Sequence, residues 1–498
     1  MVSRTSLFCA ALACAIFSLN AGENKLAQQE SEYYRIITLP TPPNTMFEAG
    51  ALQFLSADKV ACSTRTGDIW VAEGITSENP NPKWTLFASG LHEVLGLALK
   101  DGALYATQRG EVTRLKDTNG DGKADLVETV NDDWGINGDY HEYAFGSKFD
   151  KEGNIWVVLC LTGSFTSDMP YRGWCLRITP DGKSIPTCSG VRSPGGIGFN
   201  AAGDVFYTDN QGPWNGTSKL QWLKPGTFVG HPGGNKWYDQ PQTKDAIAAV
   251  GMKKPAEPKN DSRIREESKR IPELLTPTVY FPYGKMGQSA SGVACDMSNG
   301  KFGPFKEQLF VGDQTHSTVM RVFLEKVDGV YQGVCFPFKQ GFDSGSLYMD
   351  FHEDGSLFNF GTDRGWGARG GKPWALQRLV WTGKVPFEVH ELRAKPDGFE
   401  VTFTQAVDSA SVEKIESYTI DTYIVKYQSA YGSPEVDQTK PKINGVKVAP
   451  DKKSARLTVE GLVEGHIHEL HFPGVMNEKG EKLLHDAAYY TLMRIPKN

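Results

Sequence analysis

The sequence has 498 residues and a formal net charge of −6 at pH 7. That length exceeds one ordinary core and suggests two domains, and the absence of long like-charge runs argues against nucleic acid or an anionic membrane surface as a partner. Aromatic residues make up 11% of the chain, which also has 53 Gly and 28 Pro, a composition typical of short strands joined by tight turns. We therefore expect an all-β protein with a neutral, carbohydrate-like small molecule as its ligand.

The chain begins with a predicted export signal over residues 1–21. Arg4 supplies a positive start, residues 7–19 are mostly apolar, and small residues around Ala21 offer a cleavage site. The apolar stretch is too short for a comfortable transmembrane span, and no second long apolar segment follows it. We therefore expect a secreted or periplasmic protein that has no transmembrane segment once the signal is removed.

Residues 32–384 are predicted to form a six-bladed β-propeller. A turn followed by an alternating aromatic or aliphatic run occurs six times, and most copies lie about 35 to 50 residues apart, near the blade spacing of a propeller. One four-stranded blade cannot bury both of its faces, so stacked neighbours form a ring whose loops gather at one face. The six copies occupy residues 67–72, 101–106, 152–157, 202–207, 307–312 and 354–359.

The most specific motif is the run 117–128, which fits the twelve-residue calcium-loop pattern at each demanding position. Its flanks resemble strands, so we expect a structural calcium loop on the propeller and not an EF-hand sensor. The alternative is a solvated acidic hairpin tip. The predicted calcium ligands are the side-chain oxygens of Asp117, Asn119 and Asp121, the carbonyl of Lys123, a water held by Asp125 and a bidentate Glu128.

A histidine lies on a predicted loop at the mouth of the ring. His141 belongs to the run 138–143, directly ahead of a predicted strand at 148–159. Near its ordinary pKa, an imidazole can accept a proton from a sugar hydroxyl as the C–H bond breaks, which makes His141 a candidate general base. The alternative is a histidine that hydrogen-bonds one blade to the next.

Six cysteines remain once the signal is removed. Cys175 and Cys188 flank the turn-like run 180–182, so they are predicted to face each other across a hairpin. They would form a disulfide in an oxidising compartment, and separate buried thiols are the alternative. No Cys-x-x-Cys-His motif occurs, which argues against covalent haem.

Five short motifs follow one another between residues 141 and 213. They are His141, DKEGNIW at 150–156, LRITPDG at 176–182, GVRSPGGI at 190–197 and DNQGP at 209–213. In this order they resemble the glucose/sorbosone dehydrogenase family of soluble PQQ-dependent glucose dehydrogenase-like propellers. The resemblance implies a six-bladed propeller that places pyrroloquinoline quinone (PQQ) and calcium over its channel.

The resemblance also implies roles for individual positions. His141 matches the family's general base, which takes the hydroxyl proton while hydride passes to the quinone. Arg192 matches a basic residue beside the cofactor, and Gly212 and Pro213 match the stretch whose carbonyls hold the cofactor-side calcium. A separate electron acceptor would then reoxidise the quinone.

The chain departs from the family pattern at the cofactor. Ser193 replaces the family's asparagine, no lysine occurs at 314–318, and the run 344–349 lacks a closely spaced arginine pair. The three carboxylates of PQQ need cationic or well-placed donor partners in a partly dry pocket. Arg364 would replace a missing cation if its loop faces the same mouth, and a surface salt bridge is the alternative.

Residues 385–498 are predicted to form an immunoglobulin-like β-sandwich. Runs at 398–403 and 455–459 alternate inward and outward, and Asp and Gly turns separate them. Before this unit, residues 253–269 read as a charged insertion, and residues 261–270 as a solvated helix.

Two functions are consistent with these features. The first is an exported quinoprotein-like oxidoreductase that acts on a sugar or sugar-derived alcohol or aldehyde by hydride transfer, with His141 as general base. The second is a non-catalytic carbohydrate- or partner-binding propeller that has lost the quinone clamp. Positive groups that converge near His141 would favour the first function, and scattered positive groups would favour the second.

Overall fold

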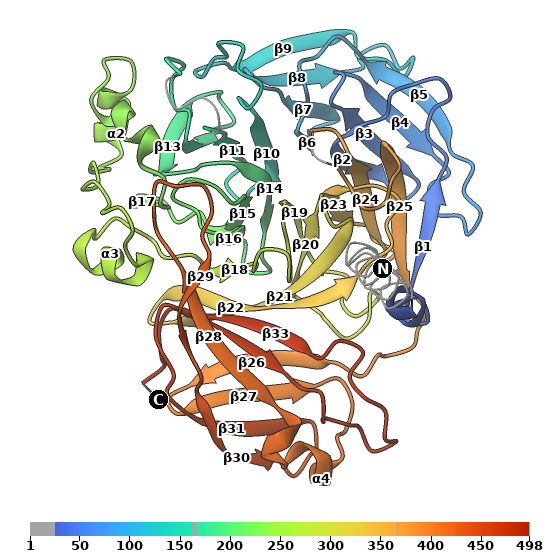
Figure 1. Cartoon of the computed structure of the whole chain (residues 1–498). Coiled ribbons are helices and arrows are strands. Elements are labelled where there is room, and N and C mark those ends of the chain that lie inside the picture. The colour runs from blue at the N-terminus through green and yellow to red at the C-terminus, as the bar shows by residue number, and fades with distance from the viewer. Residues whose placement is uncertain (1–24, 162–166, 366, 498) are drawn as a thin grey trace, which may run out of the picture.

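The structure, a computed structural model, describes residues 25–161, 167–365 and 367–497. The predicted export signal at 1–21 lies outside these ranges. The described chain consists of many antiparallel strands and a few short helices (Figure 1), so the prediction of an all-β protein is confirmed. In these ranges no helix has the length and apolar character needed to cross a membrane.

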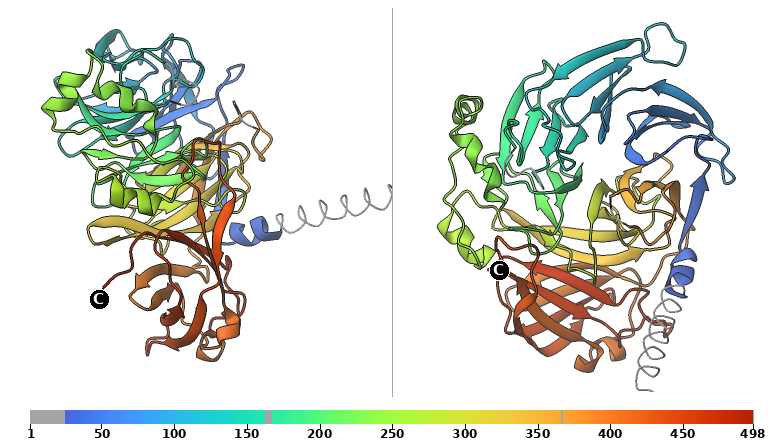
Figure 2. Two further views of the ribbon diagram at one scale, coloured as in Figure 1. Left: turned by 60° about the vertical axis from the view of Figure 1, so that its left-hand side comes forward. Right: turned by 45° about the horizontal axis from the view of Figure 1, so that its top comes forward.

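Six groups of four antiparallel strands lie around a common centre (Figure 2), and one of them belongs to a five-stranded sheet and another to an eight-stranded sheet. Their first strands pack against one another in chain order, and β23 of the last sheet returns to β2 of the first. The first three sheets are β2 (Ala49–Ser56), β3 (Lys59–Thr64), β4 (Ile69–Glu73) and β5 (Lys83–Ala88); β6 (Gly96–Lys100), β7 (Ala103–Thr107), β8 (Val112–Lys116) and β9 (Leu126–Asn131); and β10 (Ala144–Phe149), β11 (Ile155–Leu159), β12 (Trp174–Ile178) and β13 (Ser184–Ser189), which the short parallel β17 (Thr227–Phe228) extends.

The sixth sheet takes its outer strand from the other end of the ring. β1 (Tyr34–Leu39) pairs antiparallel with β25 and thereby ties the start of the ring to its end. The remaining sheets are β14 (Pro194–Phe199), β15 (Val205–Asp209), β16 (Lys219–Trp222) and β18 (Val279–Tyr280); β19 (Ala290–Cys295), β20 (Leu309–Asp313), β21 (Thr318–Val327) and β22 (Val330–Lys339); and β23 (Ser346–Phe351), β24 (Leu357–Thr362) and β25 (Trp374–Trp381) with β1.

Five of the six predicted strand copies are the second strand of their sheet. The copy at 67–72 is different, because it coincides with β4, the third strand of the first sheet, while β3 is the second. Each hairpin of a sheet joins a turn to an apolar run, so this local pattern does not distinguish a second strand from a third. The spacing from the first copy to the next is short because the first copy is a third strand and the next is a second strand.

An insertion separates β17 from β18. It contains η1 (Pro232–Tyr238), α2 (Lys244–Ala249) and α3 (Ile264–Arg270). The predicted solvated helix corresponds to α3, but Ile264 and Glu267 of α3 are buried. The insertion is therefore packed against the rest of the chain along one side of this helix.

The C-terminal unit consists of two sheets that enclose an apolar cluster (Figure 1). One sheet has the order β26-β27-β31-β30, and the other continues the fifth sheet of the ring, because β33 pairs with β22. The strands are β26 (Val389–Lys395), β27 (Gly398–Phe403), β31 (Ser454–Glu460) and β30 (Lys442–Val448), and β33 (Ala487–Leu492), β32 (His466–His471), β28 (Thr419–Val425) and β29 (Glu435–Thr439); the short helices α4 (Ser409–Val412) and η2 (Ile415–Ser417) lie between β27 and β28 in the chain.

Cys175 and Cys188 lie directly opposite each other on β12 and β13, as the hairpin prediction required. Both are buried, free thiols, and burial raises their pKa above that of an exposed cysteine. The structure therefore has the second of the two predicted arrangements, separate buried thiols.

Candidate functional site

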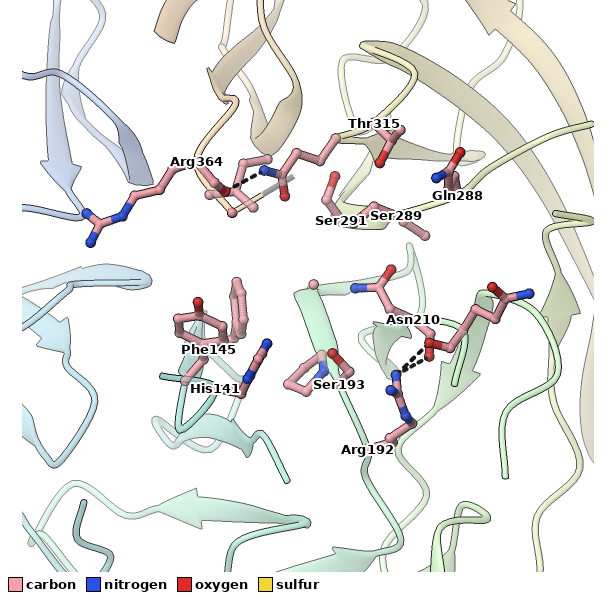
Figure 3. Close-up of a pocket in the computed structure, with 18 of the residues that line it drawn as sticks. His141, Phe145, Arg192, Ser193, Asn210, Gln288, Ser289, Ser291, Thr315 and Arg364 are labelled. Atoms are coloured by element: carbon pink, nitrogen blue, oxygen red, sulfur yellow. Dashed lines mark hydrogen bonds between the residues drawn. The ribbon is translucent and has the colours of Figure 1, made fainter. Parts of the chain in front are cut away.

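A cavity of about 650 Å³ lies where the loops of the six sheets meet (Figure 3). We call this cavity the cup. Of the residues predicted from the sequence, His141, Arg192 and Arg364 line it. Much of the remaining polar lining consists of neutral amides and hydroxyls, among them Ser193, Asn210, Gln211, Gln288, Ser291 and Thr315.

His141 lies on the loop that leads into β10, and Arg109 holds this loop. The Arg109 guanidinium donates to the main-chain carbonyls of Asp139, of Tyr140 at 3.0 Å and of Glu142 at 3.3 Å. The Asp139 carboxylate accepts the main-chain N–H of His141 at 2.8 Å. Hydrogen bonds therefore fix the backbone before and after His141, and this backbone positions the His141 side chain at the cup.

A buried ion-pair network supports the same loop. Glu93 pairs with Arg65 at 2.6 Å and with Arg109 at 3.5 Å. The Tyr143 ring lies close to both guanidinium groups, at 5.3 and 5.4 Å from its centroid, and its hydroxyl accepts a hydrogen bond from Arg65 at 3.1 Å. Arg65, Glu93 and Arg109 were not found from the sequence, because they are far from His141 in the chain.

The surroundings of His141 favour the neutral form of its imidazole. Partial burial lowers the pKa of His141 below its ordinary value, the nearby Asp139 carboxylate opposes this effect, and Arg192 and Arg109 lower the pKa further. The Nδ1 atom of His141 lies 3.7 Å from Oδ1 of Asp139. The imidazole can therefore accept a proton near neutral pH, and Asp139 is placed to stabilise the resulting cation.

Arg192 is buried in a wall of the cup that is built mainly from backbone. Its Nη1 donates to the main-chain carbonyls of Asn210 and Gln211 at 2.9 and 2.7 Å (Figure 3). The guanidinium packs against Gly212, where a Cβ atom would lie only 1.9 Å from Cζ of Arg192. Glycine is required at position 212 because of this close approach.

Gly212 and Pro213 lie behind this wall and are not among the described residues that line the cup. The carbonyl of Gly212, which the family resemblance assigns to calcium, accepts the main-chain N–H of Gly432 at 3.2 Å. Gly212 therefore adjoins Arg192, and its carbonyl is already hydrogen-bonded to the C-terminal unit.

Two buried aspartates hold the loops around the same wall. Asp209 ends β15 and accepts the main-chain N–H of Ser193 at 2.7 Å. Asp313 ends β20 and accepts the main-chain N–H groups of Gln288 and Ser289 at 2.7 and 2.8 Å. Both aspartates occupy the same place in the repeated sheet, as the last residue of its second strand.

The charges of the cup fit a neutral ligand better than PQQ. Arg65 is paired with Glu93, and Arg364 extends away from the other labelled residues to pair with Glu48 at 2.9 Å (Figure 3). Arg192 donates to main-chain carbonyls. Three carboxylates in a partly dry cavity need unbalanced positive charge. Two of the three arginines that line the cup are already paired with glutamates, although Glu93 is shared between Arg65 and Arg109.

The predicted calcium loop lies at the tip between β8 and β9 and contributes nothing to the described lining of the cup. Asp117 accepts the main-chain N–H of Gly122 at 2.8 Å, and Glu128 pairs with Arg114 at 2.7 Å. Main-chain N–H groups of the loop also donate to Asn119, Asp121 and Asp125. Within the described ranges no group of three or more His, Cys, Asp or Glu residues is arranged to hold a metal ion, so calcium stays a prediction.

Comparison with known proteins gives one family match. The model described as "Domain of unknown function (DUF7133)" matches residues 64–338. No curated protein matches the sequence.

Several solved structures are distantly similar. A protein described as an oxidoreductase (glucose dehydrogenase) by its assigned name, from Thermus thermophilus, is 19% identical, with a TM-score of 0.49 over 70% of this chain and 100% of the other. The PQQ-bound aldose sugar dehydrogenase from Streptomyces coelicolor is 15% identical, with a TM-score of 0.47 over 70% and 98%. The PQQ domain of pyranose dehydrogenase from Coprinopsis cinerea is 10% identical, with a TM-score of 0.45 over 70% and 95%. At this distance the similarity does not identify a ligand or a reaction.

Proposed function

The chain belongs to the family described as a domain of unknown function (DUF7133), and from the chemistry of its cup we propose that it is an oxidoreductase that acts on a sugar or a sugar-derived alcohol or aldehyde. The observation that carries this proposal is the place of His141, whose pKa burial lowers below the ordinary value, at a cavity whose polar lining consists largely of amides and hydroxyls. Neutral donors and acceptors suit the hydroxyl groups of a sugar, which carry no charge.

In this proposal His141 would accept the proton of the hydroxyl group that becomes a carbonyl, and the hydride from the same carbon would go to a bound quinone-type oxidant. The imidazolium that forms lies near the Asp139 carboxylate, which stabilises it. The network around Glu93 and Arg109 keeps the loop from moving as the charge develops. The role of Arg192 is to fix the opposite wall by holding the carbonyls of Asn210 and Gln211.

The proposal includes finer points that come from the sequence pattern and from the resemblance to the glucose/sorbosone dehydrogenase family. We take the six sheets as the six blades of a propeller at 32–384, residues 385–498 as an immunoglobulin-like sandwich, and residues 1–21 as an export signal. PQQ would supply the oxidising group when bound. Because Arg364 and Arg65 are paired with glutamates, the cofactor and the calcium ion are the parts of the proposal that most need a direct test.

The test is dye reduction by the purified chain over a panel of aldoses, alditols and sugar acids, with and without added calcium and PQQ. We expect turnover with at least one sugar, and a fall of about 10²- to 10⁴-fold in kcat for His141→Ala, since that is the usual contribution of a general base. Turnover that survives His141→Ala would exclude the proposed base, and no turnover on any member of the panel would contradict the oxidoreductase function.

A second function is favoured by one specific observation. The ion pairs of Arg364 with Glu48 and of Arg65 with Glu93 neutralise positive charge that a quinone clamp would need. These pairs favour a carbohydrate-binding protein without redox activity. Sugar binding measured by calorimetry, together with no turnover under any of the assay conditions, would support this second function.

A further inference from the structure

A hairpin of the C-terminal unit reaches the rim of the cup. Residues 426–434 join β28 to β29 and rise from the C-terminal unit to the ring, beside the insertion (Figure 1). Tyr431, near the tip of this hairpin, lines the cup. The proton transfer proposed for His141 gives Tyr431 no role.

The hairpin is anchored to the ring on both sides of Tyr431. The main-chain N–H of Trp214 donates to the carbonyl of Gln428 at 2.6 Å, and the N–H of Gly432 donates to the carbonyl of Gly212 at 3.2 Å. Gly432 has a φ of +66°, a conformation that favours glycine. These bonds fix the backbone of Tyr431 next to the wall that contains Arg192.

The insertion supports the lower part of the same hairpin. Ser262 and Tyr427 exchange two main-chain hydrogen bonds at 3.0 and 3.1 Å. The Asn260 side chain accepts the main-chain N–H of Ser429 at 2.7 Å. The insertion therefore serves as a platform for a segment that comes from the far end of the chain.

The Tyr431 ring is exposed although its backbone is fixed. The residue is 67% exposed, and the Arg192 guanidinium lies 5.4 Å from the centre of its ring. A ligand in the cup that covers this ring would remove apolar surface from water without having to order a mobile loop. A pyranose ring suits this position, because its C–H groups form an apolar face while its hydroxyls project at the edge, toward the amides of the cup.

We propose that Tyr431 is a specificity-determining residue that stacks on the pyranose ring of the sugar, so that the C-terminal unit completes the substrate site. This inference rests on the proposed function for the identity of the ligand as a sugar. It predicts a preference for cyclic sugars over open-chain alditols that carry the same hydroxyl groups but have no stable apolar ring face.

The test measures binding to the full chain by calorimetry, independently of turnover, with a panel of aldopyranoses and their alditols. Tyr431→Ala is expected to weaken aldopyranose binding about tenfold and to leave alditol binding within about twofold, while Tyr431→Phe keeps the wild-type Kd. Ile415→Ala is the matched control, because Ile415 is a 41% exposed side chain on the C-terminal unit and does not line the cup. Thermal unfolding of each variant shows whether it is folded.

The outcomes separate this inference from the proposed function. If the wild-type chain binds aldopyranoses through Tyr431 but reduces no dye, the inference stands and the oxidoreductase function fails. If dye reduction occurs and Tyr431→Ala keeps the wild-type Kd and KM, the inference is overturned and the function stands. The inference is also overturned if none of the aldopyranoses binds to the wild-type chain.

Discussion

The two walls of the cup are held in place by different interactions. The wall that carries His141 depends on charged side chains, with Glu93 between Arg65 and Arg109. The wall that carries Arg192 depends on backbone, with carbonyls that accept the guanidinium and a glycine that leaves room for it. The first wall should therefore be sensitive to loss of a charge, and the second to an increase in volume.

The largest effect is expected from Glu93→Ala. This change leaves two buried guanidinium groups without their carboxylate, so the free energy of unfolding should fall by about 3 to 5 kcal/mol. Chemical denaturation measures this fall in the free energy of unfolding. The control is Glu78→Ala, which removes an exposed pair with Arg35 and should change stability by less than about 1 kcal/mol. Equal effects of the two variants would contradict the buried-charge account of this wall.

Gly212→Ala should have the next largest effect, through volume alone. The added methyl group would overlap the Arg192 guanidinium, so we expect a loss of about 1 to 3 kcal/mol in the free energy of unfolding, together with weaker sugar binding. Gly445→Ala is the control, because a Cβ atom there meets no neighbour within 4 Å. If Arg192 can move aside at no cost, the two variants will match in stability and in Kd.

The pH dependence of turnover tests the electrostatics of the first wall. The base form of His141 exists above its pKa, and burial lowers that pKa, so the acid limb of kcat/KM should lie below about pH 6.5, the ordinary histidine value. Below the limb, activity should fall about tenfold per pH unit. A limb above pH 6.5 would show that the surroundings of His141 favour the cation instead.

The smallest effect is expected from Asp139→Asn. The amide keeps an oxygen that can accept the main-chain N–H of His141, but it removes the charge that raises the pKa of the imidazole. The acid limb should therefore move to still lower pH, by less than about one unit. The pH profile of the variant, compared with that of wild type, measures the shift, and a move to higher pH would exclude this role of Asp139.

Features that depend on local pattern were predictable from the sequence, and features that depend on long-range contacts were not. Alternating runs and turn residues indicated the strands, but they misplaced the copy at 67–72 by one strand. The calcium-loop pattern covers residues 117–128 and does not include Arg114, which lies directly opposite Glu128 in the register of β8 and β9. Arg109 and Glu93, which hold the loop of His141, lie tens of positions before it in the chain, so they do not form a short sequence motif with it.

The strand pair between β22 and β33 has a consequence for how this chain can be dissected. Because the two units share one hydrogen-bonded sheet, a chain shortened after the ring would expose the edge of β22 along its pairing with β33. An uncovered strand edge is a template for aggregation. The ring and the C-terminal unit should therefore melt in one cooperative transition, and function is better dissected by point substitution than by truncation.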